Sequence, residues 1–240
     1  RWFRSCSLRN NFWKEKRIDI LDFLSSLVQQ AIGHLYTLTQ ALGVPSYGLA
    51  IIFLTIIIKL VLYPLTAKQI ASTKAMSAMQ PKMKALQEKY KNDKVMLNQK
   101  LSELYKQEGV NPLAGCLPLL VQMPILIGIF YGIRDFQYAG PSSFLWMKSI
   151  ADADPYYILP VLSALTTFIQ TKQTMPATSD GGAGAAQGKV MLYFMPIFIG
   201  YISISFPAGL VLYWVVMNIM QILQQLLMDR NKDKTEVAAK

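Results

Sequence analysis

The stretch of sequence that decides the fold class is residues 190–228, VMLYFMPIFIGYISISFPAGLVLYWVVMNIMQILQQLLM, which contains no Asp, Glu, Lys or Arg in 39 residues. A helix that crosses a membrane needs about 20 consecutive apolar residues. The stretch is therefore long enough for two crossings, and Phe206-Pro207-Ala208-Gly209 supplies a break between them. This pattern indicates an integral membrane protein rather than a soluble protein with a large core.

Three further uncharged stretches, 23–58, 109–133 and 155–171, lie outside this one, and charged residues make up only 16% of the 240-residue chain. Soluble proteins carry about 25%. We therefore predict an all-α integral membrane protein with five transmembrane helices. Its core, 45–228, has spans at about residues 47–65, 113–133, 156–172, 190–205 and 208–228.

Two segments precede the first predicted span. Residues 18–44 place apolar side chains at helical spacing and polar ones between them, which predicts an amphipathic helix lying in the membrane interface. Residues 1–17 form a basic N-terminal segment with six Lys and Arg. The break at Gly43–Gly48 separates the amphipathic helix from the first span.

Residues 66–110 differ in character, because they hold nine lysines and four acidic residues. Two amphipathic helices joined by a turn at Lys91-Asn92-Asp93 fit this stretch as an antiparallel hairpin. Three methionines recur at helical spacing on its first helix. They predict either packing between the two helices or an adaptable contact surface for apolar partners. These methionines are Met76, Met79 and Met83.

The basic residues predict the orientation, since loops rich in Lys and Arg stay in the cytoplasm. The hairpin, with nine lysines, and the short tail 229–240, with four basic residues, lie on the same side in a five-span chain. We therefore expect both in the cytoplasm and the N-terminus outside. The six basic residues of 1–17 oppose this orientation, and an upstream signal or anchor would remove the conflict.

Polar side chains recur on single faces of the predicted spans, and a polar group in hydrocarbon costs free energy unless it is satisfied. They therefore turn inward together, as a polar cavity or as hydrogen bonds between helices. The groove residues predicted on this basis are Thr55, Lys59, Tyr63, Gln122, Thr167, Gln170, Trp214, Asn218 and Gln221.

Lys59 is the one charged residue in the interior of a predicted span, since Lys172 is the last residue of the span 156–172. A lysine at the centre of a membrane helix costs about 2.5–3.5 kcal/mol on insertion scales. It lies six residues before Leu65, so its side chain could snorkel to the inner surface. The other interpretation is an unpaired cation in a hydrated groove that receives an acidic ligand.

Signatures of enzymes are scarce, and we expect no enzymatic activity, cofactor or bound metal. The chain has one histidine, which excludes a pair of histidine zinc ligands, and two cysteines, Cys6 and Cys116, without ligating neighbours. Gly188-Lys189 lacks the rest of a phosphate-binding loop. The composition also argues against a nucleic-acid-binding domain, despite the net charge of +10.

Short motifs then follow one another along the chain in a specific order. They are Lys59–Thr66 (KLVLYPLT), Met79–Lys82 (MQPK), Val110–Leu113 (VNPL), Gly115–Leu120 (GCLPLL), Gln122–Pro124 (QMP), Asp154–Pro160 (DPYYILP), Phe194–Pro196 (FMP) and Phe206–Trp214 (FPAGLVLYW). With these motifs, residues 18–230 resemble the YidC-type membrane protein insertases.

The resemblance implies a five-helix core whose groove opens to the cytoplasm and sideways to lipid but is closed on the outer side. An arginine is the central cation of the groove in the family, and Lys59 stands at that position here. Lysine keeps the positive charge but lacks the bidentate fork of arginine.

The function implied is that of an insertase and chaperone in the bacterial cytoplasmic membrane. The hydrophilic tail of a newly made membrane protein enters the groove, and its transmembrane segment passes into lipid. The partners implied are nascent membrane proteins, the ribosome and targeting machinery, the Sec translocon and membrane lipids. Two alternatives remain: a small transporter or channel with Lys59 as an anion or coupling site, and a purely structural assembly partner.

Overall fold

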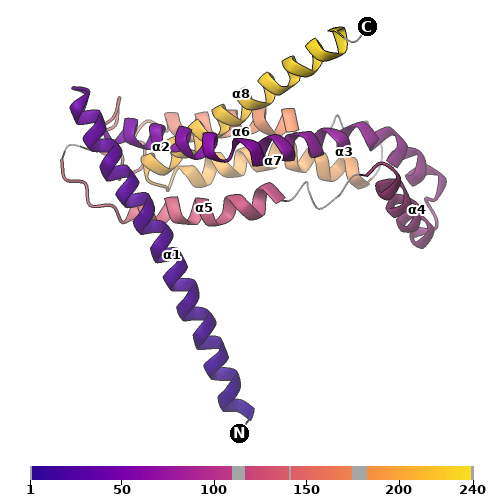
Figure 1. Cartoon of the computed structure of the whole chain (residues 1–240), viewed down its shortest axis with the longest axis horizontal. Coiled ribbons are helices and arrows are strands. Elements are labelled where there is room, and N and C mark those ends of the chain that lie inside the picture. The colour runs from indigo at the N-terminus through magenta and orange to yellow at the C-terminus, as the bar shows by residue number, and fades with distance from the viewer. Residues whose placement is uncertain (1, 110–116, 141, 175–182, 239–240) are drawn as a thin grey trace.

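The computed structural model describes residues 2–109, 117–140, 142–174 and 183–238, and every regular element within them is a helix. This confirms the all-α prediction for the described part of the chain. The helices, in chain order in Figure 1, are α1 (Trp2–Ala41), α2 (Tyr47–Val61), α3 (Tyr63–Lys89), α4 (Lys94–Gln107), α5 (Leu117–Arg134), α6 (Ile158–Thr174), α7 (Ala183–Ser203) and α8 (Ala208–Ala238).

Helix α1 is longer than the amphipathic helix predicted at 18–44, because it also takes in the basic segment 1–17. No proline or glycine interrupts the chain before Gly33, so nothing in the sequence breaks the helix earlier. The helix ends where Gly43 adopts the left-handed conformation, with φ +79°. Figure 1 shows α1 crossing one end of the helix bundle obliquely, with its N-terminal part directed away from the other helices.

Small residues on α5 allow α1 to pack closely against it. A Cβ atom at Gly132 would lie 2.6 Å from Cγ1 of Val28, and one at Gly128 would lie 3.0 Å from Cβ of Leu24. The two glycines are four residues apart and share one face of α5, as in the small-residue motifs of membrane helices. The close approach therefore depends on the absence of side chains at these two positions.

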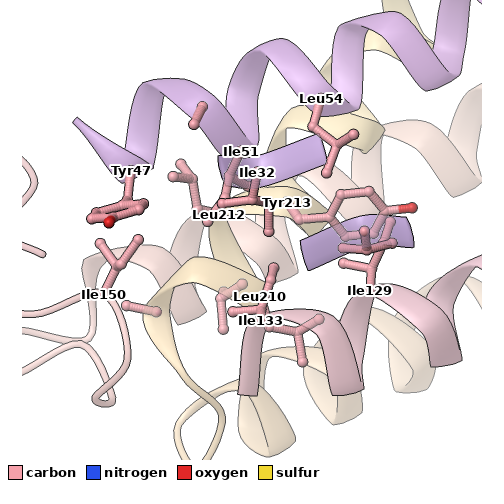
Figure 2. Close-up of a cluster of buried hydrophobic side chains, with 14 of the residues drawn as sticks. Ile32, Tyr47, Ile51, Leu54, Ile129, Ile133, Ile150, Leu210, Leu212 and Tyr213 are labelled. Carbon is pink, nitrogen blue, oxygen red and sulfur yellow. The ribbon is translucent and has the colours of Figure 1, made fainter. Parts of the chain in front are cut away.

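The hydrophobic core lies at the end of the bundle that α1 crosses. Side chains from α1, α2, α5, α8 and the loop before α6 meet there, and Figure 2 shows Ile32, Ile51, Ile133, Ile150 and Tyr213 among them. Tyr36 of α1 stacks on Tyr47 of α2 with ring centroids 3.8 Å apart. These side chains are buried against one another, so they fill this end of the bundle.

Helices α2 and α3 meet at a bend of 65° on either side of Leu62. Pro64 lies in the first turn of α3. A proline removes a backbone donor and disfavours the helical conformation in the residue before it, so a break is expected just ahead of it. The first span had been predicted to end at this Tyr63-Pro64 sequence.

Helix α3 continues into α4 through a short turn, and the two helices are antiparallel neighbours. The side chain of Asp93 caps α4 by accepting a hydrogen bond from the backbone N–H of Met96 at 2.9 Å. Lys82 of α3 pairs with Glu108, just after α4. Figure 1 shows this hairpin at the end of the bundle opposite to α1, on the side toward which the C-terminal part of α8 is also directed.

Within the described residues, one helical segment is long and apolar enough by itself to cross a membrane, Ala208–Arg230 of α8. The bent pair α2–α3 would be a second if both helices counted as one span. The apolar part of α7, Val190–Ser203, is shorter. The region that contains the start of the predicted second span, 113–116, lies outside the described residues.

Candidate functional site

A cavity of about 710 Å³ lies beyond the hydrophobic core, between α2, α3, α6 and α8. Eight of the nine predicted groove residues line it, and they come from helices far apart in the sequence. These eight are Thr55, Lys59, Gln122, Thr167, Gln170, Trp214, Asn218 and Gln221. The structure thus brings together side chains that the sequence connected only through their polarity inside apolar stretches.

Lys59 lies in the last turn of α2 with only 8% of its surface exposed. Its ammonium group donates a hydrogen bond to Oε1 of Gln221 on α8 at 2.8 Å. The amide of Gln224 on α8 reaches the backbone carbonyl of Lys59 at 3.5 Å. The side chain is thereby held across the cavity rather than extended along α2, which disfavours simple snorkelling.

The charge of Lys59 has no anionic partner among the described residues. The other charged side chains of the cavity lining, Lys74 of α3 and Asp229 of α8, form an ion pair with each other. Within the described lining the cavity therefore carries one net positive charge. A buried cation with a neutral hydrogen-bond partner can still gain electrostatic energy from an incoming anion.

The wall between α6 and α8 is built from hydrogen bonds. The hydroxyl oxygen of Thr167 accepts hydrogen bonds from Nε1 of Trp214 at 3.2 Å and from Nδ2 of Asn218 at 2.9 Å. Farther along, the amide of Gln225 donates to the backbone carbonyl of Gln173 at 2.7 Å. The polar faces therefore serve both as a cavity wall and as hydrogen bonds between helices, because the same residues do both.

Two further predicted residues occupy the deep part of the cavity. The amide of Gln122 on α5 donates to the hydroxyl of Tyr213 at 3.0 Å, which links α5 to α8. Thr55 is buried one turn before Lys59 and donates to the carbonyl of Ile51 at 2.7 Å. The hydrophobic core begins on the side of Thr55 away from Lys59, so the polar lining ends where the core starts.

Tyr63 is the predicted groove residue that the structure places elsewhere, since it does not line the cavity and is 45% exposed. Thr55, Lys59 and Tyr63 are four residues apart, so they share one face only if the helix is uninterrupted. The 65° bend at Leu62 ends that helix before Tyr63. Tyr63 therefore belongs to a new helix, and its side chain is turned toward the surface.

Comparison with known proteins identifies the family. A family model described as "60Kd inner membrane protein" matches residues 37–235, most of the chain.

The chain belongs to the 60Kd inner membrane protein family.

A protein of Fusobacterium nucleatum named membrane protein insertase YidC is 43% identical over 205 residues, which cover 85% of this chain and 96% of that relative. A protein of the same name from Francisella tularensis subsp. novicida is 41% identical over 224 residues, covering 92% of this chain and 39% of the relative. These matches confirm the family resemblance carried by the motifs.

Among solved structures, a crystal structure of active YidC insertase with its first transmembrane domain resolved matches with a TM-score of 0.60 and 29% identity. The match covers 82% of this chain and 45% of that one. This member of the 60Kd inner membrane protein family therefore spans less than half the length of that protein and of the Francisella relative.

The sequence analysis missed one wall of the cavity in this family member, the first half of α3. Thr66, Gln69, Thr73 and Ser77 line the cavity, although this segment was assigned to the hairpin. They recur every three or four residues, which places them on one face of α3. That periodicity is present in the sequence, but the lysines of the same segment are equally typical of a helix exposed to water.

The three methionines predicted as a contact surface differ in their surroundings. Met79 is buried, whereas Met76 and Met83 are partly exposed. The hydroxyl of Tyr105 on α4 lies 3.8 Å from the sulfur of Met83. Met79 and Met83 therefore pack within the protein as the structure stands, which is the simpler of the two interpretations.

Asp154, in the loop before α6, is a second residue whose role the sequence analysis did not find. It is buried, and its carboxylate accepts hydrogen bonds from Nε1 of Trp146 at 2.9 Å and from the backbone N–H groups of Tyr156 at 3.1 Å and Leu159 at 2.7 Å. The backbone N–H of Leu159 is one of the unpaired donors of the first turn of α6. Asp154 therefore joins the loop to the start of this helix.

The loop also covers the turn between α7 and α8. The backbone N–H groups of Ala208 and Gly209 donate to the carbonyls of Asp152 and Ile150 at 2.7 and 2.8 Å. Nearby, burial raises the pKa of Tyr138 to about 12, so its hydroxyl stays protonated and donates to the carbonyl of Ile133 at 3.3 Å. These contacts add a second layer over the closed end of the bundle.

Proposed function

We propose that this chain is a membrane protein insertase of the bacterial inner membrane. The observation that carries the proposal is the cavity around Lys59, closed by a hydrophobic core at one end and lined by polar side chains toward the hairpin. The names of the Fusobacterium and Francisella relatives support the same function. No cofactor takes part in it, and the partitioning of apolar client segments into lipid supplies the driving force.

The proposed topology has five spans formed by α2, α5, α6, α7 and α8. Helix α6 has 17 residues and α5 has 18, which is about 26 Å at 1.5 Å per residue. A bilayer core of about 30 Å accommodates such short helices by local thinning. The N-terminus lies outside and the C-terminus in the cytoplasm, which places the lysine-rich hairpin on the cytoplasmic side.

The polar cavity lowers the cost of moving a hydrophilic tail into the membrane. In hydrocarbon, each polar or charged group of the tail would lose its hydrogen bonds to water. The amides of Gln170 and Gln221 and the ammonium group of Lys59 offer replacement partners. An acidic tail gains most, since Lys59 has no carboxylate partner among the described residues.

The apolar segment of the client leaves along α6 and α8 into lipid. The outer face of α6 exposes Val161, Leu165 and Ile169 at helical spacing. On α8, Ile219, Leu223, Leu226 and Leu227 are exposed in the same way. Exposed apolar side chains of this extent are typical of a surface that meets lipid or an apolar partner.

The partners of this activity are nascent membrane proteins and the lipids that receive them. The ribosome and targeting machinery would approach on the hairpin side, where Lys84, Lys89 and Lys91 are located. Cooperation with the Sec translocon also belongs to the proposal. Crosslinking a photoreactive group at Gln221 to a stalled nascent chain would test whether the client occupies the cavity.

The direct test of Lys59 is an insertion assay in cells that are depleted of the native protein and then supplied with a variant. Lys59→Arg keeps the cation and is expected to retain insertion of a client with an acidic tail, whereas Lys59→Glu is expected to lose it. Lys68→Glu makes the same charge change on the exposed side of α3, outside the cavity lining, and is the matched control. Full rescue by Lys59→Glu would refute the role of the cation.

A transporter or channel with Lys59 as an anion site is the alternative. It would need the cavity to continue through the bundle, but Tyr47, Ile51 and Tyr213 close the far end. Purified protein in liposomes separates the two functions. Flux of small anions in the absence of a client would favour the transporter, and insertion of a client without such flux would favour the insertase.

A further inference from the structure

The loop between α5 and α6 carries an apolar side chain at the tip of a tight turn. Phe144 and Met147 exchange backbone hydrogen bonds of 3.0 and 2.9 Å, so Leu145 and Trp146 form the tip. Leu145 adopts the left-handed conformation, with φ 51°, and is 73% exposed. Glycine or asparagine is the usual residue at such a position, because other side chains are strained there.

The rest of the loop is firmly fixed, which makes the exposure of Leu145 a defined feature. Met147 and Ile150 are buried in the hydrophobic core. The ring of Phe144 covers Gly48 of α2 so closely that a Cβ atom there would lie 2.3 Å from it. Trp146 donates to the buried carboxylate of Asp154 at 2.9 Å. The tip is therefore held in place, while the side chain of Leu145 remains exposed.

A second strained and exposed residue lies on the other side of Asp154. Tyr157 has φ 58° and is exposed, and its neighbour Tyr156 is 67% exposed. Asp154 accepts hydrogen bonds from Trp146 and from the backbone N–H of Tyr156, so one carboxylate holds the tip and the tyrosines together. Two left-handed residues with large exposed side chains in one loop mark this loop as a candidate functional surface.

We propose that Leu145, Tyr156 and Tyr157 form a docking surface for the outer leaflet of a phospholipid bilayer. The surface continues directly into the exposed apolar face of α6, which starts at Ile158 and Val161. Tyrosine favours the boundary between lipid head groups and hydrocarbon, and leucine favours the hydrocarbon below it. The proposal rests on the topology proposed above, in which this loop lies on the outer side.

The anchor sets the depth of the outer end of the bundle in the membrane. Helix α6 is short for a full crossing, so its start has to be held at the hydrocarbon boundary on the outer side. Tyr157 directly precedes α6, and Asp154 connects the loop to its first turn. Contacts within the protein hold the loop in this conformation, and in the proposal the exposed side chains of Leu145 and Tyr157 contact lipid.

Site-directed spin labelling tests this surface in nanodiscs of phosphatidylethanolamine and phosphatidylglycerol. Leu145→Cys is labelled in a background with both native cysteines replaced by serine, and Lys148→Cys, exposed on the same loop, is the matched control. The accessibility of each label to oxygen is compared with its accessibility to a water-soluble nickel chelate. We expect an oxygen-to-nickel ratio several-fold higher at 145 than at 148.

Equal ratios at the two positions would overturn the proposal, and so would a label at 145 shielded from both reagents, which indicates a protein partner. A label at Tyr156→Cys gives a second measurement, in which Leu145→Asn is expected to shift the label toward water. An unchanged depth at 156 would refute the anchoring role of Leu145. No client is present, so these outcomes are independent of the Lys59 insertion assay.

Discussion

Replacing Lys59 by methionine should raise the stability of the fold while removing its activity. The side chain is buried, has a neutral hydrogen-bond partner in Gln221, and forms no ion pair within the described residues. Methionine has a similar length and volume, so the packing around it is largely kept. The variant therefore removes a charge without creating a large cavity, and the two readouts are expected to move in opposite directions.

The magnitude follows from two opposing contributions. A lysine at the centre of a membrane helix costs about 2.5–3.5 kcal/mol on insertion scales, which is the upper limit for Lys59 because it lies in the last turn of α2. A hydrogen bond from a charged donor, here to Oε1 of Gln221, contributes about 1.5–3 kcal/mol. The difference favours methionine by up to about 1 kcal/mol. In a protein of this size, that change raises the Tm by about 2–4 °C.

Thermal unfolding of the purified variants in nanodiscs, followed by near-ultraviolet circular dichroism, measures the first effect, and the rescue of client insertion measures the second. Lys68→Met, on the exposed side of α3, serves as the control and should change neither quantity. The reasoning is wrong if Lys59→Met lowers the Tm and still supports full insertion. That result would mean that the lysine holds the helices together and does not act on the client.

Two further predictions concern stability and are checked by the same unfolding measurements. Gly132→Leu should lower the free energy of unfolding by about 1–3 kcal/mol, because the new side chain overlaps Val28 of α1. The control Gly33→Ala, with no atom within 4 Å of the new Cβ, should raise it by up to about 1 kcal/mol. A neutral Gly132→Leu would contradict the close packing of α1 on α5. Asp154→Ala should cost at least about 2 kcal/mol, because Trp146 and two backbone N–H groups lose their acceptor. Asp154→Asn keeps an acceptor oxygen and should cost less; equal losses for the two variants would count against this explanation.

Much of the fold could be predicted because apolar stretches and their breaks are local properties of a sequence. Pro207 and Gly209 mark the turn between α7 and α8, and the structure ends α7 at Ser203 and starts α8 at Ala208. Polar residues inside apolar helices could be assigned to one site for a related reason, since hydrocarbon does not solvate them. This reasoning was sufficient for Thr55, Lys59 and Asn218.

The remaining features depend on contacts between distant residues. Tyr63 was misplaced because the direction of a helix after a bend is not encoded in its periodicity. The role of Asp154 depends on Trp146 and on the first turn of α6, which meet only in the folded loop. The polar face of α3 could be read as an exposed face or as a cavity wall, and only the position of α8 decides between them.

Beyond the bend at Leu62, α3 has one end in the cavity wall and the other in the hairpin, with Pro81 between them. Its 27 residues extend about 40 Å at 1.5 Å per residue, and Ser77 lies about halfway along. By this geometry, a rotation of about 10° at Leu62 would displace the far end by about 7 Å and the wall at Ser77 by about 4 Å. A macromolecule that moves α4 would therefore also change the width of the cavity mouth, because the same helix forms one wall of the cavity.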